Sequence, residues 1–306
     1  MRYYFFAVTT LVWILSAGAV QAQTPDAARK YFRVGTQNLE RGNLELAFEN
    51  YSRAIELSSR LTTGASKSNL AAVNENIKVI DPFTAEAYAN RGIVRYRQGD
   101  LDGAIADYNA AIRIVPIAEA YLARGVARRE KADLTGAKAD FDRAIRMNDR
   151  LPEALLDRAD LLLEQGDLAA VAADIQRALK LKPSLPAAYF LLGYLRLAEK
   201  QTDAAIAGFD RAIQLNPQMS GAYQGRGSAF LSRGDTEKAI SDFDRVVILE
   251  PQKAGAYLNR GLAMLIRGDV ESAEKDFARA LAIDPKIQTE VTRRLQVAKD
   301  LRGTRD

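Results

Sequence analysis

The side chains that most often carry catalysis or bind transition metals are missing, because the 306 residues include no histidine and no cysteine. This composition excludes disulfides, thiolate nucleophiles, imidazole bases and the usual zinc motifs. Catalysis would then need paired carboxylates, a serine–lysine arrangement or an oxygen-ligated metal. The acids instead recur at positions that a structural role explains, and no glycine-rich phosphate loop follows a strand pattern. We therefore predict no enzyme activity, no catalytic residue, no metal site and no cofactor.

Arginine and aspartate recur together, with the aspartate sixteen residues after the arginine. Two stretches lack the arginine, at Val34 and Leu192, and both also lack the acid, with Asn50 and Gly208 in its place. Because the two residues are present or absent together, we interpret them as an ion pair between two segments of one unit. If exposed, such a pair contributes only about 0 to 1 kcal/mol, and it is not a ligand-binding ladder. The predicted pairs are Arg91–Asp107, Arg124–Asp140, Arg158–Asp174, Arg226–Asp242 and Arg260–Asp276.

These pairs belong to a repeating unit. Ala47, in the stretch LELAFENYSRAI, has six counterparts at steps of 57, 33, 34, 34, 34 and 34 residues. A large apolar residue follows each alanine counterpart by four positions, and a glycine or alanine precedes it by twelve. Each unit has two helical stretches split by a turn such as RQGDLD, whose glycine suits a helix end and whose aspartate suits a helix start. The counterparts are Ala104, Ala137, Val171, Ala205, Ala239 and Ala273.

This 34-residue pattern resembles the tetratricopeptide repeat, whose signature combines an aromatic residue, a glycine, an Ala-x-x-x-Phe element and a proline. Arginine replaces the usual leucine before the glycine in five units. The resemblance implies an all-α fold, a right-handed superhelix of stacked helix pairs that ends in a capping helix. The predicted boundaries are 23–60 for the N-terminal segment and first repeat, 61–83 for an insertion, 84–116, 117–150, 151–184, 185–218, 219–252 and 253–285 for repeats two to seven, and 286–306 for the capping helix and tail.

The insertion explains the single long step between the first two repeats. Residues 61–83 are polar and small through Asn69 and apolar afterwards. Long insertions in compact repeat arrays are either functional or mobile. Both roles remain open for this segment.

The first 22 residues are typical of a signal peptide. A basic start at Met1 and Arg2 precedes an uncharged run, and small residues at Val20 and Ala22 fit the recognition pattern of signal peptidases. We predict cleavage after Ala22 and an extracytoplasmic location, either periplasmic or secreted. The alternative is an uncleaved membrane anchor, because the uncharged run from Tyr3 to Val20 approaches the roughly 20 residues that span a bilayer.

In the tetratricopeptide repeat family, ligands bind on the concave side, which is lined by the first helix of each repeat. In repeats one to four, the resemblance places mainly acidic residues on this lining. The lining residues named for these repeats are Arg29, Glu40, Glu86, Arg97, Glu119, Arg129, Glu130, Glu153, Asp160 and Glu164.

In repeats five to seven the same positions carry no charge, which makes them the candidate protein-binding groove. Two alternatives stay open: these side chains are buried between neighbouring first helices, or the chain itself fills the groove. The candidate residues are Phe190, Tyr194, Leu197, Gln224, Leu231, Leu258, Leu262 and Leu265.

The predicted function is an exported scaffold or adaptor that binds a protein or peptide partner, in a cell-envelope assembly. The alternative is a self-associating structural protein whose apolar C-terminal repeats form a homo-oligomer interface. Nucleic-acid binding is not expected, because 43 basic and 39 acidic residues give a mixed surface with a net charge of only +4.

Overall fold

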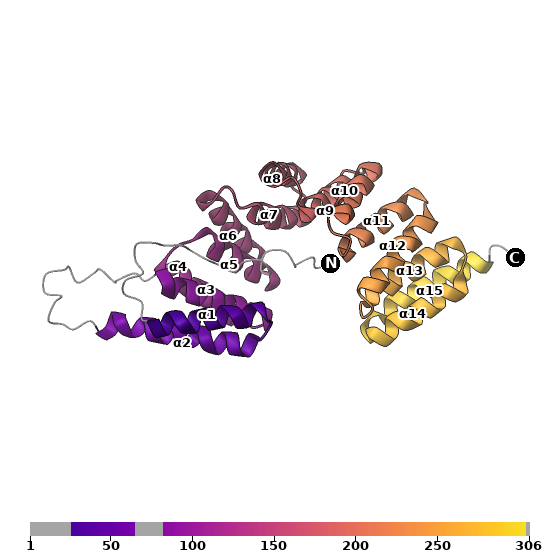
Figure 1. Cartoon of the computed structure of the whole chain (residues 1–306). Coiled ribbons are helices and arrows are strands. Elements are labelled where there is room, and N and C mark those ends of the chain that lie inside the picture. The colour runs from indigo at the N-terminus through magenta and orange to yellow at the C-terminus, as the bar shows by residue number, and fades with distance from the viewer. Residues whose placement is uncertain (1–25, 65–81, 304–306) are drawn as a thin grey trace. The chain divides into compact units, whose positions relative to one another are not determined.

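The computed structural model describes residues 26–64 and 82–303, and in these ranges the chain is built from helices (Figure 1). No β-strand occurs within these ranges. The all-α prediction is therefore confirmed. The predicted signal peptide, residues 1–22, and most of the 61–83 insertion lie outside the described residues. Their roles stay predictions.

Helices follow one another in pairs, each pair joined by a short turn. The two helices of a pair pack on each other in α1–α2, α3–α4, α5–α6, α9–α10, α11–α12 and α13–α14, and a second helix also packs on the first helix of the next pair, as α2 does on α3 and α10 on α11. This alternation is the arrangement of a helical solenoid. The pairs are α1 (Asp26–Glu40) and α2 (Leu44–Gly64), α3 (Pro82–Arg97) and α4 (Leu101–Ile114), α5 (Ala118–Glu130) and α6 (Leu134–Met147), α7 (Pro152–Gln165) and α8 (Leu168–Leu181), α9 (Pro186–Ala198) and α10 (Thr202–Leu215), α11 (Ser220–Arg233) and α12 (Thr236–Leu249), and α13 (Ala254–Arg267) and α14 (Val270–Ile283).

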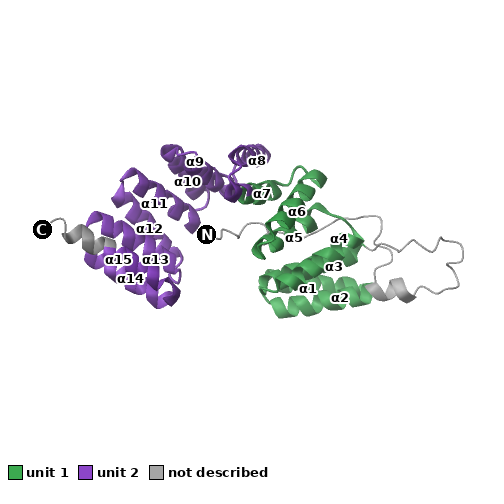
Figure 2. Ribbon diagram, turned by 180° about the vertical axis from the view of Figure 1, so that it is seen from behind, with its two compact units in different colours: residues 1–161 green, residues 162–306 purple. Residues whose placement is uncertain are grey.

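The chain divides into two compact units, residues 1–161 and 162–306, which are coloured separately in Figure 2. Helices α1 to α6 belong to unit 1, and α8 to α14 belong to unit 2. The boundary between the units falls within α7. Each unit is considered by itself below.

The turns inside the pairs follow the predicted chemistry. The Asp100 side chain accepts a hydrogen bond of 2.9 Å from the backbone N–H of Gly103 and so caps the N-terminus of α4. Gly234 ends α11 in the left-handed conformation, with φ of +88°, which a residue with a side chain rarely adopts. Asp235 occupies the equivalent of Asp100 without that capping bond and instead pairs with Arg233.

The two helices of a pair cross where a glycine meets an aromatic ring. A Cβ atom added to Gly227 would lie 2.9 Å from the Phe243 ring, and one added to Gly92 would lie 2.7 Å from the Tyr108 ring. Only a residue without a side chain therefore fits at the crossing, unless the ring moves. Both rings are fully or almost fully buried, as are their counterparts Tyr51, Phe141, Phe209 and Phe277.

A final helix closes the solenoid. After a short 3-10 turn, η1 (Pro285–Ile287), helix α15 (Gln288–Gly303) packs on α14 and α13. Its Val291 is completely buried in one cluster with Leu258 and Leu265 of α13. Arg294 also donates a hydrogen bond of 3.2 Å from Nη1 to the backbone carbonyl of Leu258. These contacts confirm the predicted capping helix, which shields the last repeat from solvent.

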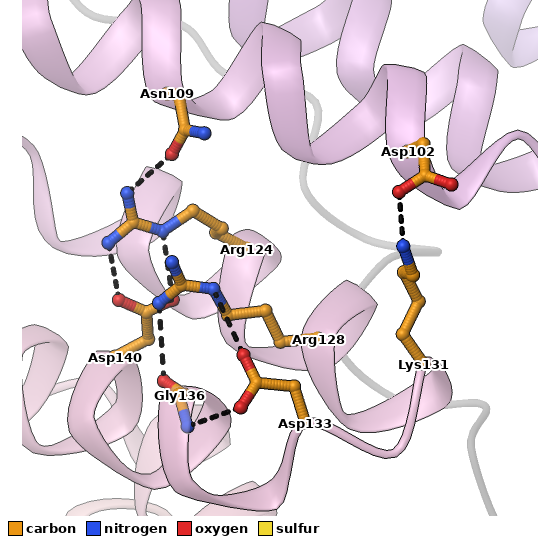
Figure 3. A network of polar contacts seen from close by, with 8 residues as sticks. All are labelled: Asp102, Asn109, Arg124, Arg128, Lys131, Asp133, Gly136 and Asp140. Atoms are coloured by element: carbon orange, nitrogen blue, oxygen red, sulfur yellow. Dashed lines mark hydrogen bonds and ion pairs between the residues drawn. The ribbon is translucent and has the colours of Figure 1, made fainter.

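Four of the five predicted pairs between an arginine and the aspartate sixteen residues later form within their repeats. In Figure 3, the Arg124 guanidinium donates two parallel hydrogen bonds to Asp140, of 2.9 Å from Nε and 2.5 Å from Nη2. The same fork occurs in three further repeats, with distances of 2.6 to 2.9 Å. The fifth predicted pair, Arg158 with Asp174, joins residues of different units and stays a prediction. The confirmed pairs are Arg91–Asp107, Arg124–Asp140, Arg226–Asp242 and Arg260–Asp276.

Each of these arginines also reaches the preceding repeat, which the sequence analysis did not predict. The remaining nitrogen, Nη1, of Arg226 lies 2.5 Å from Asp210, and that of Arg260 lies 2.8 Å from Asp244. We call this contact between consecutive repeats the repeat clamp. The equivalent contacts in unit 1 are Arg91 to Ser52, Arg124 to Asn109 and Arg158 to Asp142.

The aspartates of the confirmed sixteen-residue pairs are buried, so these pairs are not exposed surface ion pairs. Burial raises the pKa of Asp242 above its usual value, although hydrogen bonding to Arg226 acts in the opposite direction. The attraction between the two charges therefore does not fully offset the cost of removing the carboxylate from water. Loss of the arginine alone would leave a buried acid without its charge partner.

Replacing Arg226 with methionine should lower the free energy of unfolding by about 2 to 3 kcal/mol, because Asp242 then lacks its partner. Urea unfolding followed by circular dichroism measures this loss. The matched control is Arg245→Met on α12, a half-exposed arginine for which the described residues show no ion pair, and it should change the midpoint little. Equal losses in the two variants would contradict a structural role for the buried pair.

Candidate functional site

The eight predicted groove residues lie on α9, α11 and α13, the first helices of three repeats in unit 2. Four of them are buried, with exposed fractions of 3% for Phe190, 6% for Gln224, 8% for Leu258 and 4% for Leu265. These four contribute mainly to packing in the structure, as the first alternative in the sequence analysis states. Their predicted role in partner binding is untested.

Phe190 is buried because it belongs to an aromatic cluster. Its ring lies 6.2 Å from the Phe209 ring and 5.0 Å from the Tyr194 ring, both in edge-to-face geometry. Tyr194 also contacts Phe209 edge-to-face at 5.2 Å, yet it stays half-buried. Such pairs contribute about 0.5 to 1.5 kcal/mol beyond the area that they bury. Phe190 is therefore a core residue, and Tyr194 is the member of the cluster that reaches the surface.

Leu258 and Leu265 are buried for a different reason, which is the capping helix. Both belong to the cluster that includes Val291 of α15. Helix α15 therefore covers part of α13 with the chain's own residues. Whether the chain fills the rest of the candidate groove stays a prediction.

The other four predicted residues, Tyr194, Leu197, Leu231 and Leu262, are half-buried, and we call them the apolar surface. Leu197 and Leu231 both pack against one buried cluster that includes Phe243, and this cluster supports the two side chains from below the surface. Ile266, one turn beyond Leu262 on α13, is 52% exposed. These side chains carry no charge, so binding here would draw mainly on the removal of apolar area from water.

The corresponding first helices of unit 1 carry polar side chains that bind one another. The Tyr96 hydroxyl of α3 donates a hydrogen bond of 2.5 Å to Glu130 of α5. Arg129 of α5 is buried and lies 2.8 Å from Asp160 of α7. Consecutive first helices are thus joined through polar groups, of which Glu130, Arg129 and Asp160 were predicted to line the concave side and Tyr96 was not.

One acid beside this lining was not among the predicted residues. The pKa of Asp157 on α7 is raised to about 7, chiefly by burial and further by the neighbouring charges of Asp160 and Glu153. Arg129 acts in the opposite direction. The sequence does carry a signal for this acid. Glu153, Asp157 and Asp160 are spaced by four and three residues, which places the three carboxylates on one face of a helix.

Across residues 26–64 and 82–303, no group of three or more acids could hold a metal ion. Over the same residues, no helix is both long and apolar enough to cross a bilayer.

Known structures share the fold of this chain at low sequence identity. A tetratricopeptide repeat protein from Parabacteroides merdae is 18% identical, with a TM-score of 0.65 over 90% of this chain and 100% of its own. A chain of the APC/C hetero-tetramer Cut9–Hcn1 is 15% identical, with a TM-score of 0.67 over 89% of this chain and 53% of its own. PilF of Pseudomonas aeruginosa is 19% identical, with a TM-score of 0.57 over 67% of this chain and 97% of its own.

Sequence comparison identifies the family itself. No curated protein sequence gives a significant match to this chain. The sequence profiles of the tetratricopeptide repeat, in contrast, match residues 85–116, 122–186, 156–220 and 225–286, which together exceed half of the chain. With the paired helices and the recurring glycine–aromatic crossings, this match shows that the chain belongs to the tetratricopeptide repeat family.

Proposed function

We propose that this chain is a non-enzymatic scaffold that binds an apolar segment of a protein partner on the apolar surface of unit 2. Tetratricopeptide repeats form scaffolds for protein–protein interaction, and this sets the general class. The observation that supports the proposal is the row formed by Tyr194, Leu197, Leu231 and Leu262, which are half-buried, uncharged and borne by three consecutive first helices.

The energy available to such a contact is substantial. Complete burial of a large apolar side chain contributes about 1.5 to 3 kcal/mol, and a half-buried one retains part of that gain for a partner. Leu197 and Leu231 already rest on buried residues, so little conformational entropy remains to be lost on binding. The surface is therefore preorganised for a partner that supplies apolar side chains.

Unit 1 is the less suitable half for such a partner. Its first-helix side chains form hydrogen bonds and ion pairs with one another, as Tyr96 does with Glu130 and Arg129 with Asp160. A ligand would have to replace these contacts with equally good ones. This contrast supports assigning the binding function to unit 2.

The proposal includes export of the chain from the cytoplasm. The basic start, the uncharged run and the small residues at Val20 and Ala22 support a cleaved signal peptide. A partner would then be met outside the cytoplasm, in the cell envelope or beyond it.

Tyr194→Glu and Leu231→Glu should each abolish partner binding, because a carboxylate then has to be desolvated against apolar side chains. Affinity capture from the native extracytoplasmic fraction with quantitative mass spectrometry measures the loss. The matched control is Ile248→Glu on α12, a site that is 66% exposed, and it should retain the partner at the parent level.

The same samples distinguish the alternative functions. A partner that remains bound to both surface variants would contradict the assigned site. If light scattering shows a homo-oligomer that the surface variants convert to a monomer, with no foreign protein captured, self-association replaces the adaptor function.

Signal cleavage gives a spectroscopic prediction, because Trp13 is the only tryptophan. A chain processed after Ala22 should begin at Gln23 by intact mass and should show tyrosine fluorescence without tryptophan emission. An intact Met1 and tryptophan emission in the membrane fraction would instead establish an uncleaved anchor.

A further inference from the structure

Unit 2 contains three junctions between consecutive repeats, α8–α9, α10–α11 and α12–α13, and the first differs from the other two in its ion pairs. At the α10–α11 junction, Arg226 and Asp210 form a repeat clamp of 2.5 Å, and Arg260 and Asp244 form one of 2.8 Å at the α12–α13 junction. At the α8–α9 junction the two positions carry Leu192 and Gln176, which cannot form an ion pair. This junction therefore lacks the clamp by residue type.

A second ion pair follows the same division. Arg233, the last residue of α11, lies 2.6 Å from Asp203 of α10, and Arg267, the last residue of α13, lies 3.2 Å from Glu237 of α12. We call this contact the turn clamp. At the α8–α9 junction, the equivalent residues are Glu199 and Ala169, so no opposite charges meet there.

The missing arginine at position 192 accompanies a close crossing of α9 and α10. A Cβ atom added to Gly208 would lie 2.9 Å from the backbone nitrogen of Gly193, so α9 and α10 approach too closely for an aspartate at position 208. Without that acid, an arginine at position 192 would lose the partner that Asp242 provides in the next repeat. The close crossing and the unclamped junction are thus two results of one substitution pattern.

We propose that the α8–α9 junction is a flexible seam. At this seam α9 separates transiently from α8, while helices α9 to α14 keep their packing on one another. The apolar surface lies entirely on the clamped side, on α9, α11 and α13. Motion at the seam therefore leaves the four surface residues in a fixed arrangement. This inference does not depend on a partner binding there.

The absence of cysteine from the chain provides a clean probe of the seam. Ala188 of α9 and Ala222 of α11 are equivalent residues, and both are completely buried. Their counterparts Ala87 and Ala120 pack against the second helix of the preceding repeat, with Ala54 and Ala111 respectively. A cysteine at either position reports the opening of its junction by reaction with an aromatic disulfide reagent.

In the full chain, Ala188→Cys should react about tenfold faster than Ala222→Cys, because two ion pairs oppose opening at only the second junction. Adding a turn clamp with Ala169→Asp and Glu199→Arg should slow labelling of the Ala188→Cys variant. Removing both clamps with Asp203→Asn and Asp210→Asn should speed labelling of Ala222→Cys. Arg226 stays in this variant, so the buried Asp242 keeps its charge partner.

Circular dichroism confirms that each variant is folded before labelling. Equal labelling rates at the two cysteines would overturn the proposal, because the junctions would then open to the same extent. A rate at Ala188→Cys that the added clamp does not change would also overturn it, since the missing ion pairs would not be the cause.

Discussion

The close crossing of the two helices within each repeat is the constraint on which the other contacts depend. At Gly227 the helices approach until the Phe243 ring occupies the space that a side chain would fill. The residue before each ring, such as Asp242, then lies against the glycine at the same crossing, where its carboxylate is buried. A buried carboxylate is costly without a cation, and the arginine preceding the glycine provides one within the same repeat. Glycine, aromatic ring, acid and arginine thus form one packing unit, and its arginine also reaches a side chain of the preceding repeat, which is Asp210 in the case of Arg226.

The sequence pattern predicted the contacts within a repeat but not the clamp between consecutive repeats. The pair of Arg226 and Asp242 could be predicted because both residues disappear together at Leu192 and Gly208. The repeat clamp could not, because its acceptors are of three types, with Ser52, Asn109 and Asp210 at equivalent positions. A structural role shared by serine, asparagine and aspartate does not produce a recognisable residue pattern in one sequence. The structure shows the repeat clamp because two nitrogens of Arg226 bind Asp242 and the third binds Asp210.

Burial on the candidate surface was harder to predict for a related reason. Phe190 and Tyr194 are both aromatic and lie one turn apart, yet only Phe190 is fully buried. The difference comes from neighbours in other helices, among them Phe209. Leu258 likewise becomes interior because α15 follows the last repeat and packs on it. Helical periodicity identifies the face of a residue on its own helix, but not which neighbouring elements cover that face.

The residues that remain uncovered are the ones that structure alone does not account for. A repeat must bury its second-helix contacts and its contacts with the next repeat, and Phe243 and Leu258 serve those needs. Tyr194 and Leu262 are half-buried even with both contacts in place. At the position equivalent to Leu231, by contrast, unit 1 has Tyr96, whose hydroxyl donates a hydrogen bond to Glu130. Uncharged side chains on three consecutive first helices thus leave unit 2 with apolar area that its own helix contacts do not cover, and area of this kind is what binding to another molecule would bury.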